Sequence, residues 1–218
     1  MPTILTMKVD RIEPVNGQEH MFKLHLSDGS VLKTQDHVIA DLGLFSGMEL
    51  DEDGLQQLKT AVGKASAKAR AVRIISATGV SKQELEHRLT QKGEKPEDAR
   101  EAVRWLSELE LLDDEKTARQ LVDSAVRKGY GKSRIRQILY EKRIPREYWE
   151  SALAELPEMD DAVDKFLSQR FRGRTPNEKE VKRTIDALIR RGHNWQDIRA
   201  GLRRYSVSLD EHLEDSYE

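Results

Sequence analysis

The segments ELEHRLTQKG (residues 84–93), RIRQILYEKR (134–143) and RTIDALIRRG (183–192) decide the fold of this chain. In each segment a Leu is followed three residues later by Lys or Arg and then by Gly or Arg. A pattern that returns about every fifty residues is typical of one supersecondary unit copied in tandem, in which each copy buries its apolar face against its own helices and its neighbours. We therefore expect a modular array, and such arrays usually bind other molecules.

Apolar residues recur at helical spacing through each copy and predict three helices per copy. In the first copy we expect a stripe of Ala69, Val72 and Ile75, a second helix capped by Ser81, and a third opened by Pro96. The predicted fold class is mainly α, with three tandem three-helix repeats in an elongated array after a small N-terminal β-rich segment. The predicted boundaries are 1–62 for the N-terminal β-meander with short helices, 63–113, 114–157 and 158–206 for the repeats, and 207–218 for an acidic, disordered tail.

The first fifty residues have the pattern of strands. Phe22, Leu24 and Leu26 alternate with polar residues, and Asn16-Gly17 ahead of them is a hairpin signal because both residues tolerate positive φ. We expect a short helix over residues 36–42, and we expect Asp51 to cap the helix that follows it. We place the joint with the repeats near residues 63–66.

Composition excludes several classes of protein. The 218 residues contain no Cys, which excludes disulfides and thiolate metal sites and fits a reducing compartment. No apolar run approaches the roughly 18 to 20 residues that cross a bilayer, and the chain does not begin with a signal peptide pattern. We expect a cytoplasmic monomer without a membrane contact.

Charge is distributed unevenly along the chain. Residues 116–205 carry 22 Lys or Arg against 13 Asp or Glu, a balance of +9, whereas residues 1–58 carry 4 against 10, or −6, and residues 207–218 add −5. The basic excess belongs to the second and third copies. A region with this excess of positive charge attracts polyanions or an acidic protein surface, although basic helix faces are often simply solvated.

Motifs that carry catalysis are missing. Gly131-Lys132-Ser133 resembles the end of a phosphate-binding loop, but Val126 stands where that loop needs Gly, and a helix precedes it instead of a strand. The six histidines are scattered without ligand spacing. The pairs Asp113-Asp114 and Asp160-Asp161 each come just before a first helix, where carboxylates cap free amides. We expect a protein that is not an enzyme, with no catalytic residues, cofactor or metal.

Each of the three tryptophans, Trp105, Trp149 and Trp195, falls in the third helix of its copy. Aromatic residues at this place are either core residues between helices or platforms on which bases of a single strand stack. We favour the core interpretation because single-strand binders tend to display aromatics on strands or grooves beside basic groups.

An ordered set of residues resembles the signature repeats of the RecX regulatory proteins. The set comprises Ala71, Ser81, Glu84-Leu85, Leu89, Lys92-Gly93, Val103, Leu106, Leu111 to Asp114, Ala118, Arg127 to Gly129, Ile135 to Leu139, Lys165-Phe166, Arg191 to His193 and Asp197-Ile198. His193 stands where that family more often has an aromatic residue. The resemblance, over residues 66–205, implies a bacterial modulator that lies along the groove of the RecA recombinase filament on single-stranded DNA. It also implies inhibition of strand exchange, ATP hydrolysis and co-protease activity.

The basic excess predicts where such a partner binds. We hypothesise a surface facing the recombinase filament, with weak or indirect contact to single-stranded DNA, made of Lys132, Arg134, Arg136, Lys142 and Arg143 in the second copy and Arg172, Arg174, Lys182, Arg183, Arg190 and Arg191 in the third. Two alternatives stay open: a sequence-tolerant DNA-binding protein built of three-helix modules, and a helical-repeat adaptor for another protein.

Overall fold

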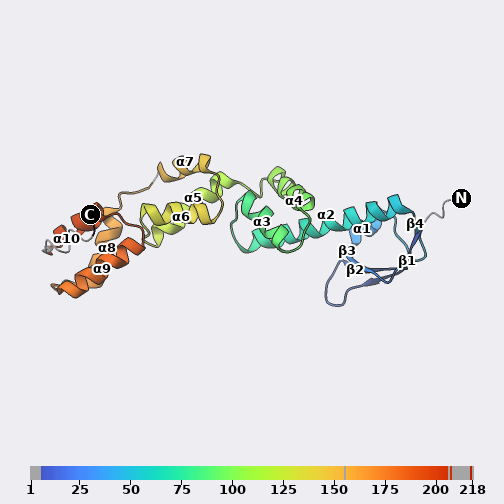
Figure 1. Cartoon of the computed structure of the whole chain (residues 1–218), viewed down its shortest axis with the longest axis horizontal. Coiled ribbons are helices and arrows are strands. Elements are labelled where there is room, and N and C mark those ends of the chain that lie inside the picture. Colours follow the sequence, from blue (N-terminus) through green and yellow to red (C-terminus); the bar gives the residue numbers. More distant parts are fainter. Residues whose placement is uncertain (1–5, 155, 206, 208–216, 218) are drawn as a thin grey trace. The chain divides into compact units, whose positions relative to one another are not determined.

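The computed structural model describes residues 6–154, 156–205, 207 and 217 (Figure 1). The chain divides into two compact units, Met1–Leu112 and Asp113–Glu218. Of the predicted acidic tail, only Val207 and Tyr217 belong to the described residues.

The first unit begins with a small antiparallel sheet of order β3-β2-β1-β4. Its strands are β1 (Met7–Pro14), β2 (Met21–Leu26), β3 (Val31–Gln35) and β4 (Glu49–Leu50), and a short helix α1 (Asp36–Asp41) follows β3. The predicted meander is formed by β1, β2 and β3, which pair in sequence. Strand β4 returns to pair with β1, where Met7 lies opposite Leu50.

Helix α2 (Glu52–Ala77) connects the sheet with the first repeat without a break. Asp51 caps it as predicted, accepting a hydrogen bond of 2.8 Å from the Gly54 N–H. The predicted joint near residues 63–66 is therefore not a break in the helix. Leu58, in its first half, packs in the core with the sheet, whereas Ala71, in its second half, packs in the core of the first repeat.

The inward stripe of α2 differs from the predicted one. Ala67 and Ala71 are buried and Ile74 packs beside them, whereas Val72 is exposed. Of the predicted stripe, Ile75 packs against the core of the first repeat and Ala69 is half-buried, so only Val72 is wrong. Small alanines on several sides of the helix leave its apolar face poorly marked.

The first repeat combines the second half of α2 with α3 (Lys82–Gln91) and α4 (Pro96–Glu108). Ser81 caps α3 by accepting a hydrogen bond of 3.1 Å from the Glu84 N–H, and Pro96 begins α4, both as predicted. Leu85, Leu89 and Leu106 are fully buried between the helices.

The second unit contains the other two repeats, each around its own core. The second repeat consists of α5 (Asp114–Arg127), α6 (Lys132–Glu141), a 3-10 turn (Arg146–Tyr148) and α7 (Trp149–Ala154); the third consists of α8 (Asp160–Phe171), α9 (Glu178–Arg190) and α10 (Trp195–Arg204). Pro145 therefore opens a 3-10 turn ahead of the short α7, not an α-helix directly. The described residues confirm the predicted class of mainly α three-helix repeats after a β-rich segment.

Candidate interaction surface

The recurring Leu and Gly positions form the same helix end in all three repeats. After α3, the Gly93 N–H donates to the Thr90 carbonyl oxygen at 3.0 Å and the Glu94 N–H donates to the Leu89 carbonyl oxygen at 3.1 Å. The same pair of bonds follows α6, at residues 139–144, and α9, at residues 188–193. This is the Schellman motif, which needs a left-handed residue directly after the helix. We call residues 92–94, 142–144 and 191–193 the cap turns.

Arg143 occupies the left-handed position of the second cap turn. Its φ is +53°, where Gly93 and Gly192 have +90° and +85°. A residue with a Cβ loses roughly 1 to 2 kcal/mol in this conformation relative to right-handed backbone. Arg143 is one of the predicted partner-facing cations, and the backbone alone would favour Gly there.

The third cap turn also packs against the second repeat. The Gly131 N–H donates to the Arg191 carbonyl oxygen at 2.8 Å, and the Ser133 N–H donates to the Gly192 carbonyl oxygen at 3.2 Å. A Cβ at Gly131 would collide with the Gly192 carbonyl, and a Cβ at Gly192 would collide with the Arg134 backbone. Both glycines are thus required by a close backbone approach, which we call the repeat junction (residues 128–134 with 191–193).

Two side chains of the third cap turn complete the repeat junction. The Arg191 guanidinium donates to the Lys128 carbonyl oxygen at 3.0 Å and lies 5.0 Å from the centre of the Phe166 ring. His193 is 5% exposed, and its Nε2 lies 3.1 Å from the Gly129 carbonyl oxygen. Because a carbonyl can only accept, this Nε2 carries the proton. Burial lowers the pKa of His193, so the ring is held neutral.

The repeat junction brings four of the predicted cations to one place. Lys132 and Arg134 open α6, and Arg190 and Arg191 end α9, on either side of the Gly131–Arg191 hydrogen bond. The other predicted cations lie away from it. Lys142 and Arg143 follow α6, Arg172 and Arg174 precede α9, and Lys182 and Arg183 lie in its first half. Helices of 10 and 13 residues are roughly 15 and 20 Å long, so the predicted set is spread over both helices.

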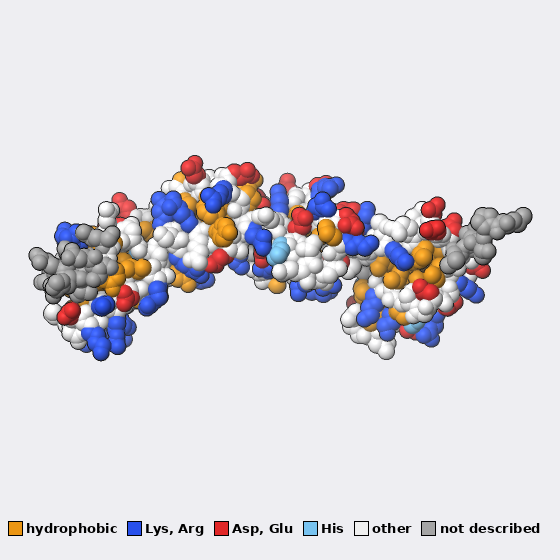
Figure 2. Space-filling model, viewed as in Figure 1, with side chains coloured by type: hydrophobic (Ala, Val, Ile, Leu, Met, Phe, Trp, Pro, Cys, Tyr) orange, Lys and Arg blue, Asp and Glu red, His pale blue; other side chains and the backbone are white. Residues whose placement is uncertain are grey.

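Several of the predicted cations are held by partners within the unit. Arg134 donates to Glu141 at 3.1 Å, Arg174 donates to Glu180 at 3.1 Å, and Arg191 holds the repeat junction. Six exposed cations form no ion pair with any described residue: Lys132, Arg136, Arg172, Lys182, Arg183 and Arg190. On the face shown in Figure 2, Lys and Arg side chains gather over α9. Arg183 and Arg190, seven residues apart, lie on the same side of that helix.

Tyr140 is a surface residue that the sequence reasoning missed. It is 69% exposed and lies four residues after Arg136 on α6, so the two side chains are neighbours on one face. The helical spacing carries the signal, because Tyr140 directly follows the buried Leu139 and so falls at the edge of the apolar stripe. An exposed aromatic residue beside cations is the combination that binds single-stranded nucleic acid.

The three tryptophans are partly buried against the core of their own repeats. The Trp149 Nε1–H donates to the Ile144 carbonyl oxygen at 3.0 Å. These contacts support the core interpretation of the tryptophans.

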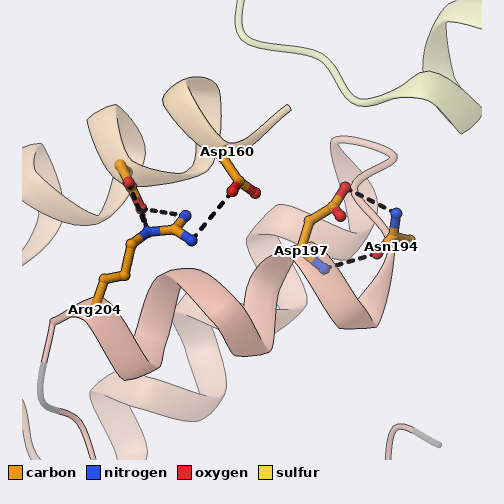
Figure 3. Close-up of polar contacts among 5 residues, drawn as sticks. Asp160, Asn194, Asp197 and Arg204 are labelled. Carbon is orange, nitrogen blue, oxygen red and sulfur yellow. Dashed lines mark hydrogen bonds and ion pairs between the residues drawn. The ribbon is translucent and has the colours of Figure 1, made fainter. Parts of the chain in front are cut away.

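The predicted acidic caps are only half right. Asp113 caps α5, accepting a hydrogen bond of 3.0 Å from the Lys116 N–H. Asp160 instead lies within the first turn of α8, without a side-chain cap, and accepts from Arg204 of α10 at 3.2 Å (Figure 3). Arg204 also donates to Asp164 at 2.9 Å, so these carboxylates fasten α8 to α10. The Asn194 side chain caps α10 in the same view.

Among the described residues, no group of three or more His, Cys, Asp or Glu is arranged to hold a metal ion. No helix within the same ranges has the length and hydropathy of a bilayer span.

Known proteins that are similar to this chain include regulatory proteins of the RecX family. The family model for the second three-helix domain of RecX matches residues 113–153, which include α5 and α6. The regulatory protein RecX of Vibrio parahaemolyticus is 31% identical over 148 residues, covering 67% of this chain and 92% of that protein. Its counterpart in Cronobacter sakazakii is 34% identical over 155 residues, covering 62% of this chain and 90% of that protein.

Solved structures share the fold. A crystal structure of regulatory protein RecX superimposes with a TM-score of 0.60 and 21% identity, covering 89% of this chain and 98% of that one. RecX from Lactobacillus salivarius gives a TM-score of 0.55 and 18% identity, covering 67% and 98%. Because relatives at 31% and 34% identity are covered over nearly their whole length, the chain belongs to the RecX family of regulatory proteins.

Proposed function

We propose that this protein binds the RecA recombinase filament on single-stranded DNA, in the cytoplasm and as a monomer, and restrains its strand exchange, ATP hydrolysis and co-protease activity. Its membership of the RecX family supports this role. The observation that carries the proposed surface is the set of exposed cations on α6 and α9 that form no ion pair with any residue in the described ranges. Such cations attract a filament that contains DNA phosphates.

The start of α6 supports a binding role for its cations. Lys132 and Arg134 lie in its first turn, which contains no acidic residue. A helix start favours negative charge, so each cation there loses roughly 0.3 to 1 kcal/mol of helix stability. Helix α3 also begins with a cation, Lys82, but it has Glu84 at the position of Arg134. Arg134 thus stands at a place that helix stability alone disfavours, which supports a role for it in contact with another molecule.

The test is ATP hydrolysis by the recombinase on single-stranded DNA with rising amounts of this protein. Wild type should inhibit hydrolysis, and the triple variant Arg136→Glu/Arg183→Glu/Arg190→Glu should need about tenfold more protein for half inhibition. These three side chains are exposed and make none of the hydrogen bonds of the repeat junction, so helical circular dichroism should be unchanged. No inhibition by excess wild type would refute the proposed function.

A matched control comes from the first unit. Arg73, Lys92 and Arg104 are exposed cations of the first repeat. The variant Arg73→Glu/Lys92→Glu/Arg104→Glu changes net charge by the same amount as the test variant and should keep the wild-type inhibition curve. Equal loss in both triple variants would mean that net charge, and not the surface on α6 and α9, determines inhibition.

Tyr140 beside Arg136 favours one second candidate, a protein that binds single-stranded DNA directly. That function predicts tight binding to a labelled oligonucleotide without the recombinase, with an affinity that falls steeply as salt rises. Tyr140→Ala should then weaken binding at every salt concentration, because stacking is less sensitive to salt than phosphate contacts. Recovery of an unrelated protein without any recombinase in a pull-down would instead favour the adaptor function.

A further inference from the structure

Tyr217 packs against the third repeat from the C-terminal end of the chain. Its ring stacks on Trp195 of α10, with ring centres 5.5 Å apart and an angle of 27° between the planes. Its hydroxyl donates to the Asp186 carboxylate of α9 at 2.6 Å. Tyr217 thereby joins the partly buried residues around the core of this repeat. One ring with both a stacking partner and a hydrogen-bond acceptor is a specific anchor.

The anchor lies in the middle of the basic part of α9. Asp186 is four residues after Lys182 and four before Arg190, so both cations are its neighbours on the helix surface, roughly 6 Å away between Cβ atoms. Asp186 is hydrogen-bonded to Tyr217, and within the described ranges it forms no ion pair with Lys182 or Arg190. Both cations therefore remain available to another anion.

The sequence next to Tyr217 is acidic. Asp215 comes two residues before it and Glu218 directly after it, and Asp210, Glu211 and Glu214 complete residues 207–218. Two residues of extended chain span at most about 7 Å. Two acidic residues, Asp215 and Glu218, are thus within two positions of a side chain that contacts α9.

We propose that α9 and α10 form a docking site for the chain's own acidic C-terminal segment, with Tyr217 as its anchor, and that the docked segment competes with polyanionic partners for Lys182, Arg183 and Arg190. This intramolecular contact makes the segment a built-in competitor of the basic surface. The proposal rests on the proposed function only in taking α9 as a binding surface. Burial, with the Asp186 hydrogen bond, raises the pKa of Tyr217 to about 12, so the hydroxyl remains a donor at neutral pH.

Docking can be measured without any partner. Full-length protein labelled with 5-fluorotryptophan gives one fluorine resonance for each of its three tryptophans, and Trp195→Phe assigns the relevant one. Tyr217→Ala should move the Trp195 resonance and leave those of Trp105 and Trp149, which serve as internal controls. Tyr217→Phe should move it less, because the stacked ring remains. An unmoved Trp195 resonance in Tyr217→Ala would overturn the docking.

Competition is measured by fluorescence anisotropy with a labelled oligo-dT at low salt. Tyr217→Ala should tighten binding about fivefold, which corresponds to releasing two or three exposed ion pairs. A second variant, Asp210→Asn/Glu211→Gln/Glu214→Gln/Asp215→Asn/Glu218→Gln, should tighten binding similarly while the Trp195 resonance stays in place, since the anchor is intact. The gain should shrink as salt rises.

The outcomes separate the two proposals. Unchanged affinity in both variants would overturn the competition, and so would a failure of every variant to bind the oligonucleotide. Either result would mean that releasing the C-terminal segment does not make the basic surface of α9 bind a polyanion more tightly. If the resonance shift and the tighter binding are found but no variant, wild type included, affects the recombinase, the docking site stands and the proposed function fails.

Discussion

The cap turns of the first and third repeats have the same backbone and different surroundings. Gly93 and Gly192 both end a helix in the left-handed conformation, and both are followed by a residue that donates to a buried Leu carbonyl. Around Gly93 there is open space, whereas Gly192 lies directly on the Arg134 backbone. The first cap turn therefore only ends a helix, and the third also joins two repeats.

The residue after each of these two glycines also differs in what its side chain contacts. Glu94 accepts hydrogen bonds from Arg70 at 2.6 Å and Ser66 at 2.9 Å, both on α2 of its own repeat. His193 reaches instead to the Gly129 carbonyl of the neighbouring repeat. A repeat signature thus determines where a helix ends, while the next residue determines which element that end contacts.

Replacing the two glycines should give the largest contrast. Gly93→Ala should lower the free energy of unfolding by about 1 kcal/mol, the cost of a Cβ in left-handed backbone. Gly192→Ala adds a collision with the Arg134 backbone and should lower it by about 3 kcal/mol. Urea unfolding checks this, with Trp105 reporting on the first unit and Trp149 and Trp195 on the second. Equal losses would contradict the close approach at Gly192.

Gly131→Ser is a control in which the expected change in stability is opposite to the change that helix-capping preference alone predicts. Ser is a slightly better helix cap than Gly, as Ser81 shows at the corresponding start of α3. Gly131 has a φ of −79°, so a Cβ would not strain its own backbone. If the repeat junction forms as described, Gly131→Ser nevertheless destabilises the second unit, because its side chain collides with the Gly192 carbonyl.

Much of the fold could be predicted from the sequence because its signals are local. Ser81, Pro96 and Asp113 mark helix starts, and the Leu-x-x-Lys-Gly pattern marks helix ends, each through contacts within a few residues. The joint near Gly63 lies inside the continuous helix α2, because a glycine inside a helix is compatible with continuation when both halves are packed.

The candidate surface was less predictable because exposure depends on distant residues. Arg191 has the same place in its repeat as Lys92, yet it donates to a carbonyl more than sixty residues earlier in the chain. Charge alone cannot distinguish such an Arg from Arg183, which stays exposed. Tyr140 was missed for the converse reason, since an apolar pattern does not show which aromatic residue lies at its edge.

Arg191 and Lys92 allow the third and first cap turns to be compared through side chains alone, with no change at the glycines. Arg191→Ala removes a hydrogen bond to Lys128 and a cation–π contact with Phe166, and should lower the free energy of unfolding by about 1.5 kcal/mol. Lys92→Ala, at an exposed helix end, should change it by less than about 0.5 kcal/mol. Urea unfolding of both variants is the measurement, and a loss of the same size in Lys92→Ala would contradict the distinction.

At the second cap turn, a substitution should raise the free energy of unfolding instead of lowering it. Arg143→Gly relieves left-handed strain and should raise the free energy of unfolding by about 1 kcal/mol. If Arg143 also contacts the recombinase, the more stable variant should inhibit ATP hydrolysis less well. Arg143→Asn is the matched control, since Asn tolerates this backbone but lacks the charge. A destabilised Arg143→Gly would show that other contacts of the Arg side chain outweigh the strain.

The smallest expected effect is a pH dependence confined to the third cap turn. The pKa of His193 is lowered by burial and by the nearby Arg191, against the opposing effects of the Gly129 hydrogen bond and Asp197. The unfolded chain therefore binds a proton on this ring more readily than the folded one, and stability is lost as pH falls below about 6.5. His193→Gln should remove this part of the pH dependence, because an amide can donate to Gly129 without titrating.

The measurement is the free energy of unfolding of the second unit between pH 7.5 and 5, followed through Trp195. The first unit, followed through Trp105, should respond identically in wild type and His193→Gln. An unchanged pH profile of the second unit in His193→Gln would mean that the ring titrates freely, and that the third cap turn opens from Gly129 more readily than its burial implies.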